Sequence, residues 1–191
     1  VYVSFFVSRR RRHTRLRRDW SSDVSSSDLA DPAARFLAPF HADARPTVVA
    51  GSTWTSDEDV LIPALDIVRQ RVPDMRLILA PHEPGPDHVR ALCRRLTADG
   101  WSTATLSSVE ESASVRGVDV VVVDRVGVLA DLYTVGRVAY VGGGFHGAGL
   151  HSVLEPAAAR LPVLFGPSHH GSRAAADLIG ADAALDRNSV V

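Results

Sequence analysis

Short runs of aliphatic and β-branched residues alternate with longer amphipathic stretches from residue 47 onward. The run VDVVVVD at residues 118–124 has no polar alternation, which is typical of a strand buried on both faces of a parallel sheet. The pattern predicts strands at residues 47–51, 75–80, 102–106, 118–124, 137–144, 162–166 and 183–185. It predicts helices at residues 56–71, 87–99, 128–135, 153–160 and 172–179, and a short helix or linker at residues 31–41.

This alternation of strands and helices is that of βαβ units. We therefore predict an α/β fold with a Rossmann-like, doubly wound and mostly parallel sheet. The sequence contains no internal repeat and no apolar run of 18 residues. Because ligands of doubly wound sheets bind outside the carboxyl ends of the strands, the loops after the strands are the places to search for function.

The start of the helix at residues 56–71 is predicted from its polar residues. Ser56 is a favourable N-cap, and the acidic residues 57–59 place negative charge in the first turn, where the helix dipole stabilises it. Helical periodicity predicts one inward face, made of Val60, Leu61, Ala64, Leu65 and Val68.

Composition narrows the class of protein. The chain has 191 residues, of which 46% are hydrophobic and 23% charged, so a fibrous or fully disordered chain is excluded and a globular core is expected. The single cysteine, Cys93, excludes a disulfide framework and a cysteine-rich metal site, and it suits a reducing compartment. A net charge of −1 gives no overall argument for binding nucleic acid or an anionic membrane.

The charge is unevenly distributed. Residues 1–28 contain seven Arg and three Asp, a net charge of +4, so residues 29–191 carry −5. The segment VYVSFFVSRRRRHTRLRRDWSS has no structural period, and its apolar stretch precedes its positive charge, the reverse of a signal peptide. It closely resembles a translated sequencing adapter, so we expect residues 1–28 to be a non-native, disordered arm. The alternative is a basic arm that binds nucleic acid.

The strand predicted at residues 137–144 ends in a glycine run, with further glycines close behind it. Gly142, Gly143 and Gly144 come just before a predicted helix, where bare backbone amides and a helix N-terminus can bind a phosphate. All 21 basic side chains are Arg, so no Lys is available for this role, and backbone amides, His and Arg remain. The alternative is a flexible turn without a ligand.

The next segment, His151 to Pro156, contains a candidate ribose ligand. Ser152 and Glu155 have the spacing of a capping box. If the helix instead begins near Pro156, which is favoured at the first helical position, Glu155 lies at its mouth and can accept hydrogen bonds from ribose hydroxyls. Both interpretations remain open at this point.

Two other loops carry titratable side chains. His82 and Glu83 lie between Pro81 and Pro84, which hold the loop rigid; the alternative is an ordinary surface turn. Four histidines, namely His146, His151, His169 and His170, raise the question of a metal site. No ligand spacing of a zinc site recurs among them, so we predict no metal and no cofactor.

Taken jointly, the segments GSTWTSDED, LILAPHEP, VVVVDRVGVLADLY, VAYVGGGFHGAGLHSVLEPAA and PVLFGP resemble the C-terminal domain of the 3-deoxy-D-manno-octulosonic acid (Kdo) transferases of lipopolysaccharide biosynthesis. The resemblance covers about residues 46–185. It implies a GT-B glycosyltransferase, in which two Rossmann-like domains face each other across a cleft. Residues 46–191 would be the second, CMP-sugar-binding domain, and residues 29–45 a linker or short helix.

The resemblance also implies an activity. Members transfer Kdo from CMP-Kdo to a lipid A precursor (lipid IVA) with inversion, without a required metal, on the cytoplasmic side of the bacterial inner membrane. Their catalytic base, acceptor surface and membrane anchor belong to the N-terminal domain. We therefore expect no catalytic residue in this chain, no nucleic acid partner, and an incomplete enzyme. The alternatives are another GT-B enzyme, such as a UDP-sugar transferase or an enzyme like UDP-GlcNAc 2-epimerase, or a non-catalytic nucleotide-binding fragment.

Carried over position by position, the resemblance implies that the donor is bound by Gly51, Ser52, Thr53, Pro81, His82, Glu83, Gly127, Gly142, Gly143, Gly144, His151, Ser152 and Glu155. Two positions depart from the family pattern. His82 stands where Arg is common, and Ser152 stands where Asn is common. Either departure could weaken donor binding or mark a subfamily with another acceptor.

Overall fold

The structure is a computed structural model, and it describes residues 30–186. Its strands are β1 (Thr47–Thr53), β2 (Arg76–Pro81), β3 (Thr103–Thr105), β4 (Val120–Val122), β5 (Val138–Val141), β6 (Val163–Phe165) and β7 (Ala184–Asp186). Its helices are α1 (Ala38–Ala42), preceded by the 3-10 turn η2 (Arg35–Leu37), α2 (Thr55–Arg69), α3 (Pro86–Ala98), α4 (Leu106–Ser112), α5 (Leu129–Tyr133), α6 (Leu154–Ala158) and α7 (Arg173–Gly180). The interpretation of residues 1–28 as an arm lies outside the described residues.

The seven strands form one sheet in the order β3-β4-β2-β1-β5-β6-β7, with every neighbouring pair parallel. The predicted doubly wound α/β fold is therefore confirmed. The chain proceeds from β1 towards β4 on one side and from β5 to β7 on the other, so the strand order reverses between β1 and β5. Ligands of doubly wound sheets bind at this reversal, outside the carboxyl ends of the strands.

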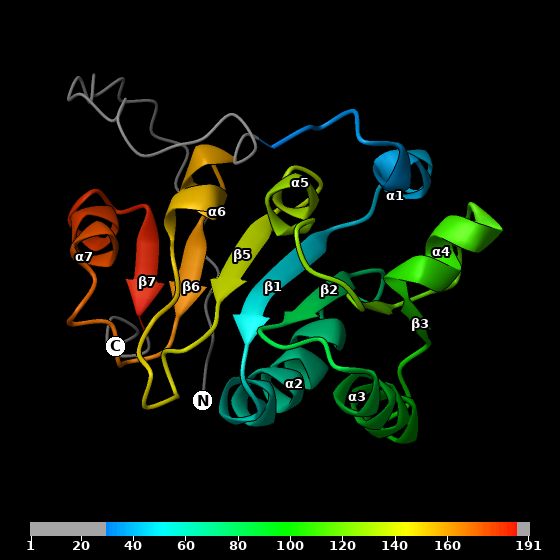
Figure 1. The fold of residues 1–191 in the computed structure, drawn as a ribbon, viewed down its shortest axis with the longest axis horizontal. Helices are drawn as coiled ribbons and strands as arrows, with labels where there is room; N and C mark the ends of the chain where they lie inside the picture. The colour runs from blue at the N-terminus through cyan, green and yellow to red at the C-terminus, as the bar shows by residue number, and fades with distance from the viewer. Residues whose placement is uncertain (1–29, 187–191) are drawn as a thin grey trace.

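Helices cover both faces of the sheet, with α2 and α3 below it and α1 and α5 above it in Figure 1. Alternation along β2 shows why both faces need cover. Leu77 and Leu79 pack in the cluster of α2 and α3, whereas Ile78 and Ala80 pack in the cluster of α1, α4 and α5. The run at residues 120–123 divides in the same way and is at most 2% exposed, as its unbroken apolar sequence predicts.

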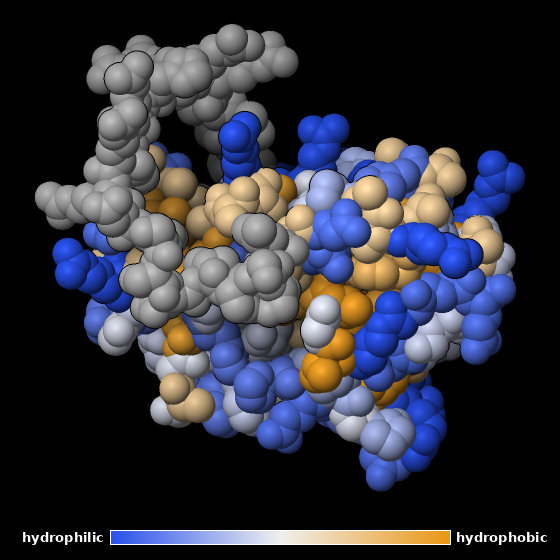
Figure 2. All heavy atoms as spheres, turned by 45° about the horizontal axis from the view of Figure 1, so that its top comes forward, coloured by the Kyte–Doolittle hydropathy of each residue, from blue (hydrophilic) through white to orange (hydrophobic). Residues whose placement is uncertain are grey.

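A third apolar cluster lies at the other end of the sheet, beneath α6 and α7, and joins Val141, Val153, Val163, Phe165, Ala175 and Ala184. Apolar side chains also reach the surface on the side of α1 and α5, which Figure 2 turns forward. These include residues that pack against the first cluster while remaining partly exposed, such as Phe36, Val128 and Leu161.

The structure adds one element that was not predicted, helix α4, and corrects two predictions for helix α2. Helix α2 begins at Thr55 with Trp54 as its N-cap, two residues before the predicted cap at Ser56. Of its predicted inward face, Leu65 is buried and Leu61 and Val68 pack against the core as expected. Val60 (42% exposed) and Ala64 are exposed instead, and the buried Ile62 was not predicted. None of the helices formed by residues 30–186 is long and apolar enough to cross a bilayer.

Candidate functional site

The loops after β1, β2 and β5 meet at the carboxyl edge of the sheet, where the strand order reverses. Their backbones are joined by hydrogen bonds from the Gly142 amide to the Gly51 carbonyl (2.9 Å) and from the His82 amide to the Thr53 carbonyl (2.9 Å). The His151 amide donates to the Gly142 carbonyl (3.1 Å) and brings the following segment to the same place. The structure thus brings together predicted site residues from three separate loops.

The carboxylate of Asp57 ties these loops to the first turn of α2. It is 0% exposed, and its Oδ2 accepts hydrogen bonds from the amides of Trp54 (3.0 Å) and Gly143 (2.8 Å). Its Oδ1 accepts from the Tyr140 hydroxyl (2.9 Å) and from the Phe145 amide (3.3 Å). Burial raises the pKa of Tyr140 above its ordinary value, and the negative charge of Asp57 raises it further. A buried carboxylate thus holds the glycine loop against α2.

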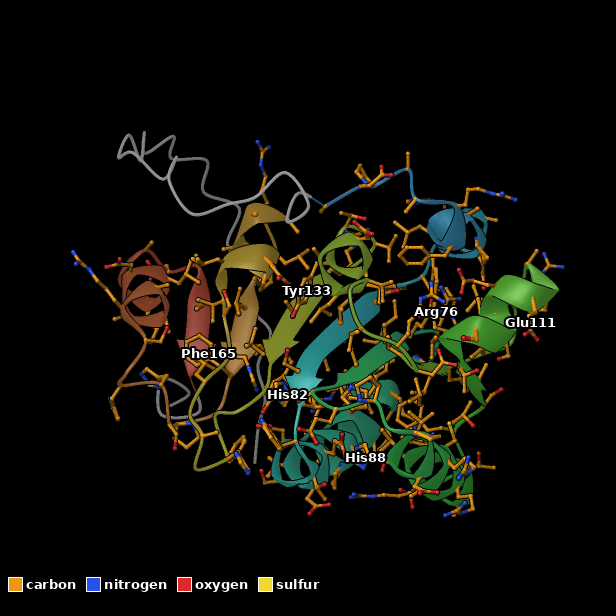
Figure 3. All side chains as sticks on the ribbon, viewed as in Figure 1. Arg76, His82, His88, Glu111, Tyr133 and Phe165 are labelled. Carbon is orange, nitrogen blue, oxygen red and sulfur yellow. The ribbon has the colours of Figure 1, made fainter. Side chains whose placement is uncertain are left out.

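A second buried carboxylate, Glu58, fixes the end of β1. It is 1% exposed, and its Oε1 accepts a hydrogen bond from Thr53 Oγ1 (3.0 Å). The same oxygen lies 3.2 Å from Nε2 of His88, which comes from α3. Figure 3 shows His88 between α2 and α3 and His82 near the arrowhead of β1. The turn after Thr53, which carries Trp54, is therefore fixed by contacts to Glu58 of α2 and, through Glu58, to His88 of α3.

Four aromatic rings pack together in front of this turn, and we call Trp54, His82, His146 and His151 the ring cluster. The Trp54 and His146 rings are stacked, with centroids 4.1 Å apart and planes 4° apart. His82 lies 4.6 Å from Trp54 and 4.3 Å from His151. Trp54 Nε1 donates a hydrogen bond to His151 Nε2 (3.0 Å). Burial, followed by the neighbouring His82, lowers the pKa of His151.

The glycine loop is built differently from the predicted row of bare amides. The amide of Gly142 is bonded to Gly51 and that of Gly143 to Asp57. A Cβ at Gly142 would lie 2.1 Å from the Ser52 carbonyl oxygen, and one at Gly144 would lie 2.4 Å from the Gly166 amide nitrogen. These glycines therefore let backbones approach one another, and their role in phosphate binding stays a prediction.

Gly51 and Glu155 both lie close to Tyr133 of α5. A Cβ at Gly51 would stand 2.2 Å from the Tyr133 hydroxyl oxygen, so only glycine fits there. Burial raises the pKa of Tyr133, and the negative charge of Glu155 adds to this shift. Nearby positions have unusual backbones, because Ser52 (φ 53°) and Gly127 (φ 82°) are both left-handed.

The predicted capping box of Ser152 and Glu155 does not form. Helix α6 begins at Leu154 with Val153 as its N-cap, and Ser152 Oγ accepts a hydrogen bond from the Leu154 amide (3.3 Å) instead. The helix does not begin at Pro156 either, since Glu155 already lies in its first turn. The exposed Glu155 is nevertheless at the mouth of α6, as the ribose-binding interpretation requires.

A surface hollow of about 480 Å³ adjoins the ring cluster on the side of α7. Its lining includes His151, Ser152, Ser168, Ser172 and Arg173. Pro81 ends β2, and both His82 and Glu83 are exposed after it, which fits either a rigid ligand loop or an ordinary surface turn, so their role in donor binding stays a prediction. Among residues 30–186, no three His, Cys, Asp or Glu side chains are grouped so as to hold a metal ion.

Several residues of the site were not predicted, namely Trp54, Asp57, Glu58, His88 and Tyr140, and His146 was considered only as a possible metal ligand. The acidic residues were recognised only as partners of the helix dipole, since nothing in the sequence shows that they are buried. A tryptophan directly after the first buried strand was the one available signal, because a large aromatic ring at a strand end is positioned to meet a ligand.

Comparison with known proteins finds relatives that are named as glycosyltransferases. No family model matches it. It is 32% identical over 123 residues to the 3-deoxy-D-manno-octulosonic acid transferase of Aquifex aeolicus, a match that covers 64% of this chain and 32% of the relative. It is 30% identical over 132 residues to the enzyme of the same name from Rickettsia typhi, covering 66% of this chain and 26% of the relative. A bifunctional glycosyltransferase/methyltransferase of Fusobacterium nucleatum is 30% identical over 122 residues, which are 64% of this chain and 18% of that protein.

The fold agrees with a solved structure. The C-terminal CMP-Kdo binding domain of WaaA from Acinetobacter baumannii superposes with a TM-score of 0.68 at 23% identity, covering 81% of this chain and 79% of that domain. The chain spans about a third or less of the length of the curated relatives that it matches. The resemblance seen in the motifs is confirmed: the chain is homologous to the Kdo transferases, and residues 30–186 have the fold of their C-terminal domain.

Proposed function

We propose that this chain is the donor-binding half of a Kdo transferase, and that the donor is CMP-Kdo. The observation that carries the proposal is the agreement between two similarities. The sequence is similar to enzymes named as Kdo transferases, and the fold is that of a domain named for binding CMP-Kdo. The convergence of Gly51, His82 and His151 at the reversal of strand order supports the same proposal. Glu155 is linked to this place through Tyr133, whose hydroxyl lies beside Gly51.

The phosphate and the ribose of the donor require different binding groups. When CMP leaves, negative charge develops on its phosphate, so fixed positive charges and donors near the phosphate accelerate transfer. We propose that the ring cluster and the neighbouring hollow face this phosphate. The first turn of α6 supplies Glu155, whose carboxylate accepts hydrogen bonds from the two ribose hydroxyls.

The acceptor hydroxyl needs a general base within hydrogen-bond reach. In this proposal the base, the lipid A precursor (lipid IVA) and the attachment to the cytoplasmic side of the inner membrane belong to the N-terminal domain of a full-length enzyme. The transfer inverts the configuration at the anomeric carbon, because the hydroxyl attacks from the side opposite CMP. The present chain is then expected to bind the donor without catalysing transfer.

Thermal stabilisation by nucleotides tests this proposal. A ligand at one hundred times its Kd stabilises the folded state by about 2.7 kcal/mol, which corresponds to a Tm increase of roughly 5–10 °C in a domain of this size. We expect this increase with CMP and CMP-Kdo. Glu155→Ala is expected to abolish it, whereas Glu111→Ala, at an exposed position of α4 on the far side of the molecule, is expected to leave it intact (Figure 3).

Two outcomes would contradict the proposal. The absence of any stabilisation by CMP and CMP-Kdo would show that the chain does not bind this donor. Stabilisation by UDP in preference to CMP would favour the alternative of a UDP-sugar enzyme with the same fold.

A further inference from the structure

A second hollow lies at the amino edge of the sheet, opposite the candidate site. It has a volume of about 200 Å³ and is formed where the segments before β1 and β5 meet. The Arg137 amide donates a hydrogen bond to the Thr47 carbonyl (2.7 Å) and joins these segments. In Figure 3 the labelled Arg76 marks this side of the molecule, near α1, whereas His82 marks the arrowhead of β1. The hollow is therefore separate from the loops that we propose to bind the donor.

Three arginines lie at the beginning of neighbouring strands here. Arg45 precedes β1, Arg76 begins β2 and Arg137 precedes β5. The Arg76 amide donates to the Pro46 carbonyl (2.8 Å), so the beginnings of β1 and β2 are joined as those of β1 and β5 are. The strand order β2-β1-β5 thus gathers three permanent positive charges at one edge of the sheet.

Two of these arginines already have acidic partners. Arg76 is 1% exposed and donates from Nη2 to Asp43 Oδ2 (2.7 Å). Arg45 donates from Nη2 to Asp119 Oδ1 (3.1 Å), and three further hydrogen bonds to backbone carbonyls leave it with one N–H to spare. Both side chains are held in place by the protein itself, so they supply positive potential rather than donors for a ligand.

Arg137 is different, because within residues 30–186 its side chain forms no hydrogen bond and no ion pair. The residue is exposed and lines the hollow together with Arg45 and His41. Among the described residues that line the hollow there is no Asp or Glu. His41 Nε2 lies 3.1 Å from the Pro32 carbonyl oxygen and is thereby engaged. Arg137 thus offers a full set of N–H donors, in the planar arrangement that pairs with both oxygens of a carboxylate.

The rest of the wall of the hollow is mostly apolar. It includes Phe40, which is 3% exposed, as well as Pro46 and Val135. The buried guanidinium of Arg76 lies over the Phe40 ring, 5.7 Å from its centroid. Pockets for drug-sized ligands have volumes of roughly 300–1,000 Å³, so a hollow of about 200 Å³ fits one compact apolar group. The hollow therefore combines an apolar wall with one cation whose donors are uncommitted.

We propose that this hollow binds a small organic carboxylate. The two carboxylate oxygens accept hydrogen bonds from the Arg137 guanidinium, and the apolar group of the ligand, an aromatic ring or a branched aliphatic chain, contacts Phe40, Pro46 and Val135. One cation with uncommitted donors matches the single charge of a carboxylate, whereas a phosphate monoester carries about −1.5 to −2 charges at pH 7 and requires a second cation. The binding is reversible, and it is independent of the proposed function because it uses the opposite edge of the sheet.

An NMR titration of the full 191-residue chain, followed by amide chemical shifts, tests the proposal with matched ligands. Phenylacetate carries both groups, phenylacetamide keeps the ring without the charge, and acetate keeps the charge without the ring. We expect saturable binding of phenylacetate, with the largest shifts at the amides of Thr47 and Arg137. Phenylacetamide and acetate are expected to bind at least about tenfold more weakly, because hydrogen bonds between charged groups and burial of a ring each contribute that factor or more.

Three variants assign the carboxylate to Arg137. Arg137→Gln removes the charge and is expected to weaken phenylacetate binding at least about tenfold. Arg137→Lys keeps the charge without the planar pair of donors, so we expect intermediate affinity. Arg116→Gln is the matched control, because Arg116 is an exposed arginine in the segment before β4 that does not line the hollow, and it is expected to bind as the unmodified chain does. Thermal melting followed by circular dichroism verifies that each variant is folded, and the comparison of ligands on the unmodified chain needs no variant.

Several results would overturn the inference. These are the absence of saturable phenylacetate binding, equally tight binding of phenylacetamide, and unchanged phenylacetate binding by Arg137→Gln. Inorganic phosphate that binds more tightly than phenylacetate also overturns it, because the hollow would then select an oxyanion without an apolar group. None of these results affects the proposed function, which is tested by CMP binding at the carboxyl edge.

Discussion

Asp57→Asn removes the charge of the carboxylate that joins the glycine loop to α2 and changes little else. An asparagine keeps one oxygen, which can still accept from the amides of Trp54 and Gly143. Its NH₂ group then takes the place of Oδ1, the oxygen that accepts from the Tyr140 hydroxyl and the Phe145 amide in Asp57. The Tyr140 hydroxyl can rotate and accept a hydrogen bond from this NH₂ group. The Phe145 amide can only donate, so it loses its acceptor. One hydrogen bond to a charged group is lost, and the others lose their charge assistance.

The magnitude follows from these changes. Hydrogen bonds to charged groups contribute about 1.5–3 kcal/mol each, and a buried donor without an acceptor costs about 1–3 kcal/mol. We therefore expect Asp57→Asn to lower the free energy of unfolding by about 2–4 kcal/mol. In a domain of this size, that is a Tm decrease of roughly 5–15 °C.

Urea unfolding at pH 7, followed by circular dichroism, measures this change. Asp59→Asn is the matched control, because Asp59 lies two residues along the same helix, is 58% exposed at its side chain, and forms a surface ion pair with Arg95. Such pairs contribute at most about 1 kcal/mol. Equal stability of the two variants would refute the view that Asp57 holds the loops together.

Two further predictions concern the backbone contacts and the buried tyrosines. Gly142→Ala places a Cβ 2.1 Å from the Ser52 carbonyl oxygen and is expected to destabilise the fold by about 1–3 kcal/mol or more. At Gly147 an added Cβ would have no atom within 4 Å, so Gly147→Ala is expected to change stability by less than about 0.5 kcal/mol. Equal urea midpoints for Gly142→Ala and Gly147→Ala would contradict the role of close backbone packing at Gly142. Because burial raises the pKa of both Tyr133 and Tyr140, their contribution to stability is complete below about pH 10 and is lost as the pH rises further, by up to about 1.4 kcal/mol per pH unit for each tyrosine. The chain has no Lys to titrate in this range, so Tyr133→Phe should make the decline between about pH 10 and 12 shallower; an unchanged slope would contradict it.

The elements of the fold that were predicted correctly are those whose local hydrophobic pattern is sufficient to specify a helix or a strand. The valine run at residues 120–123 could only be a central strand, because it offers no polar face to solvent. Helix α4 was missed because its sequence, LSSVEES, contains only two apolar residues, Leu106 and Val109. Both are buried against the sheet, which is a tertiary contact that the local pattern does not report.

The site was predicted as a set of loops but not as a set of contacts. The glycines after β5 were correctly located at a strand end, yet their tight packing against Ser52 and Gly166 comes from other loops. The ring cluster joins residues up to 97 positions apart, so no local pattern could reveal it. Asp57 shows the same limit, because an acidic residue in the first turn of a helix is ordinarily exposed and here accepts four hydrogen bonds.

The central claim is that these loops bind a cytidine nucleotide as the donor half of a Kdo transferase. The most direct measurement is a pair of calorimetric titrations of the full chain, one with CMP and one with UDP, each repeated with Glu155→Ala. The account predicts that CMP binds more tightly than UDP and that Glu155→Ala abolishes CMP binding. Equal or tighter binding of UDP, or CMP binding that persists unchanged without the Glu155 carboxylate, would contradict it.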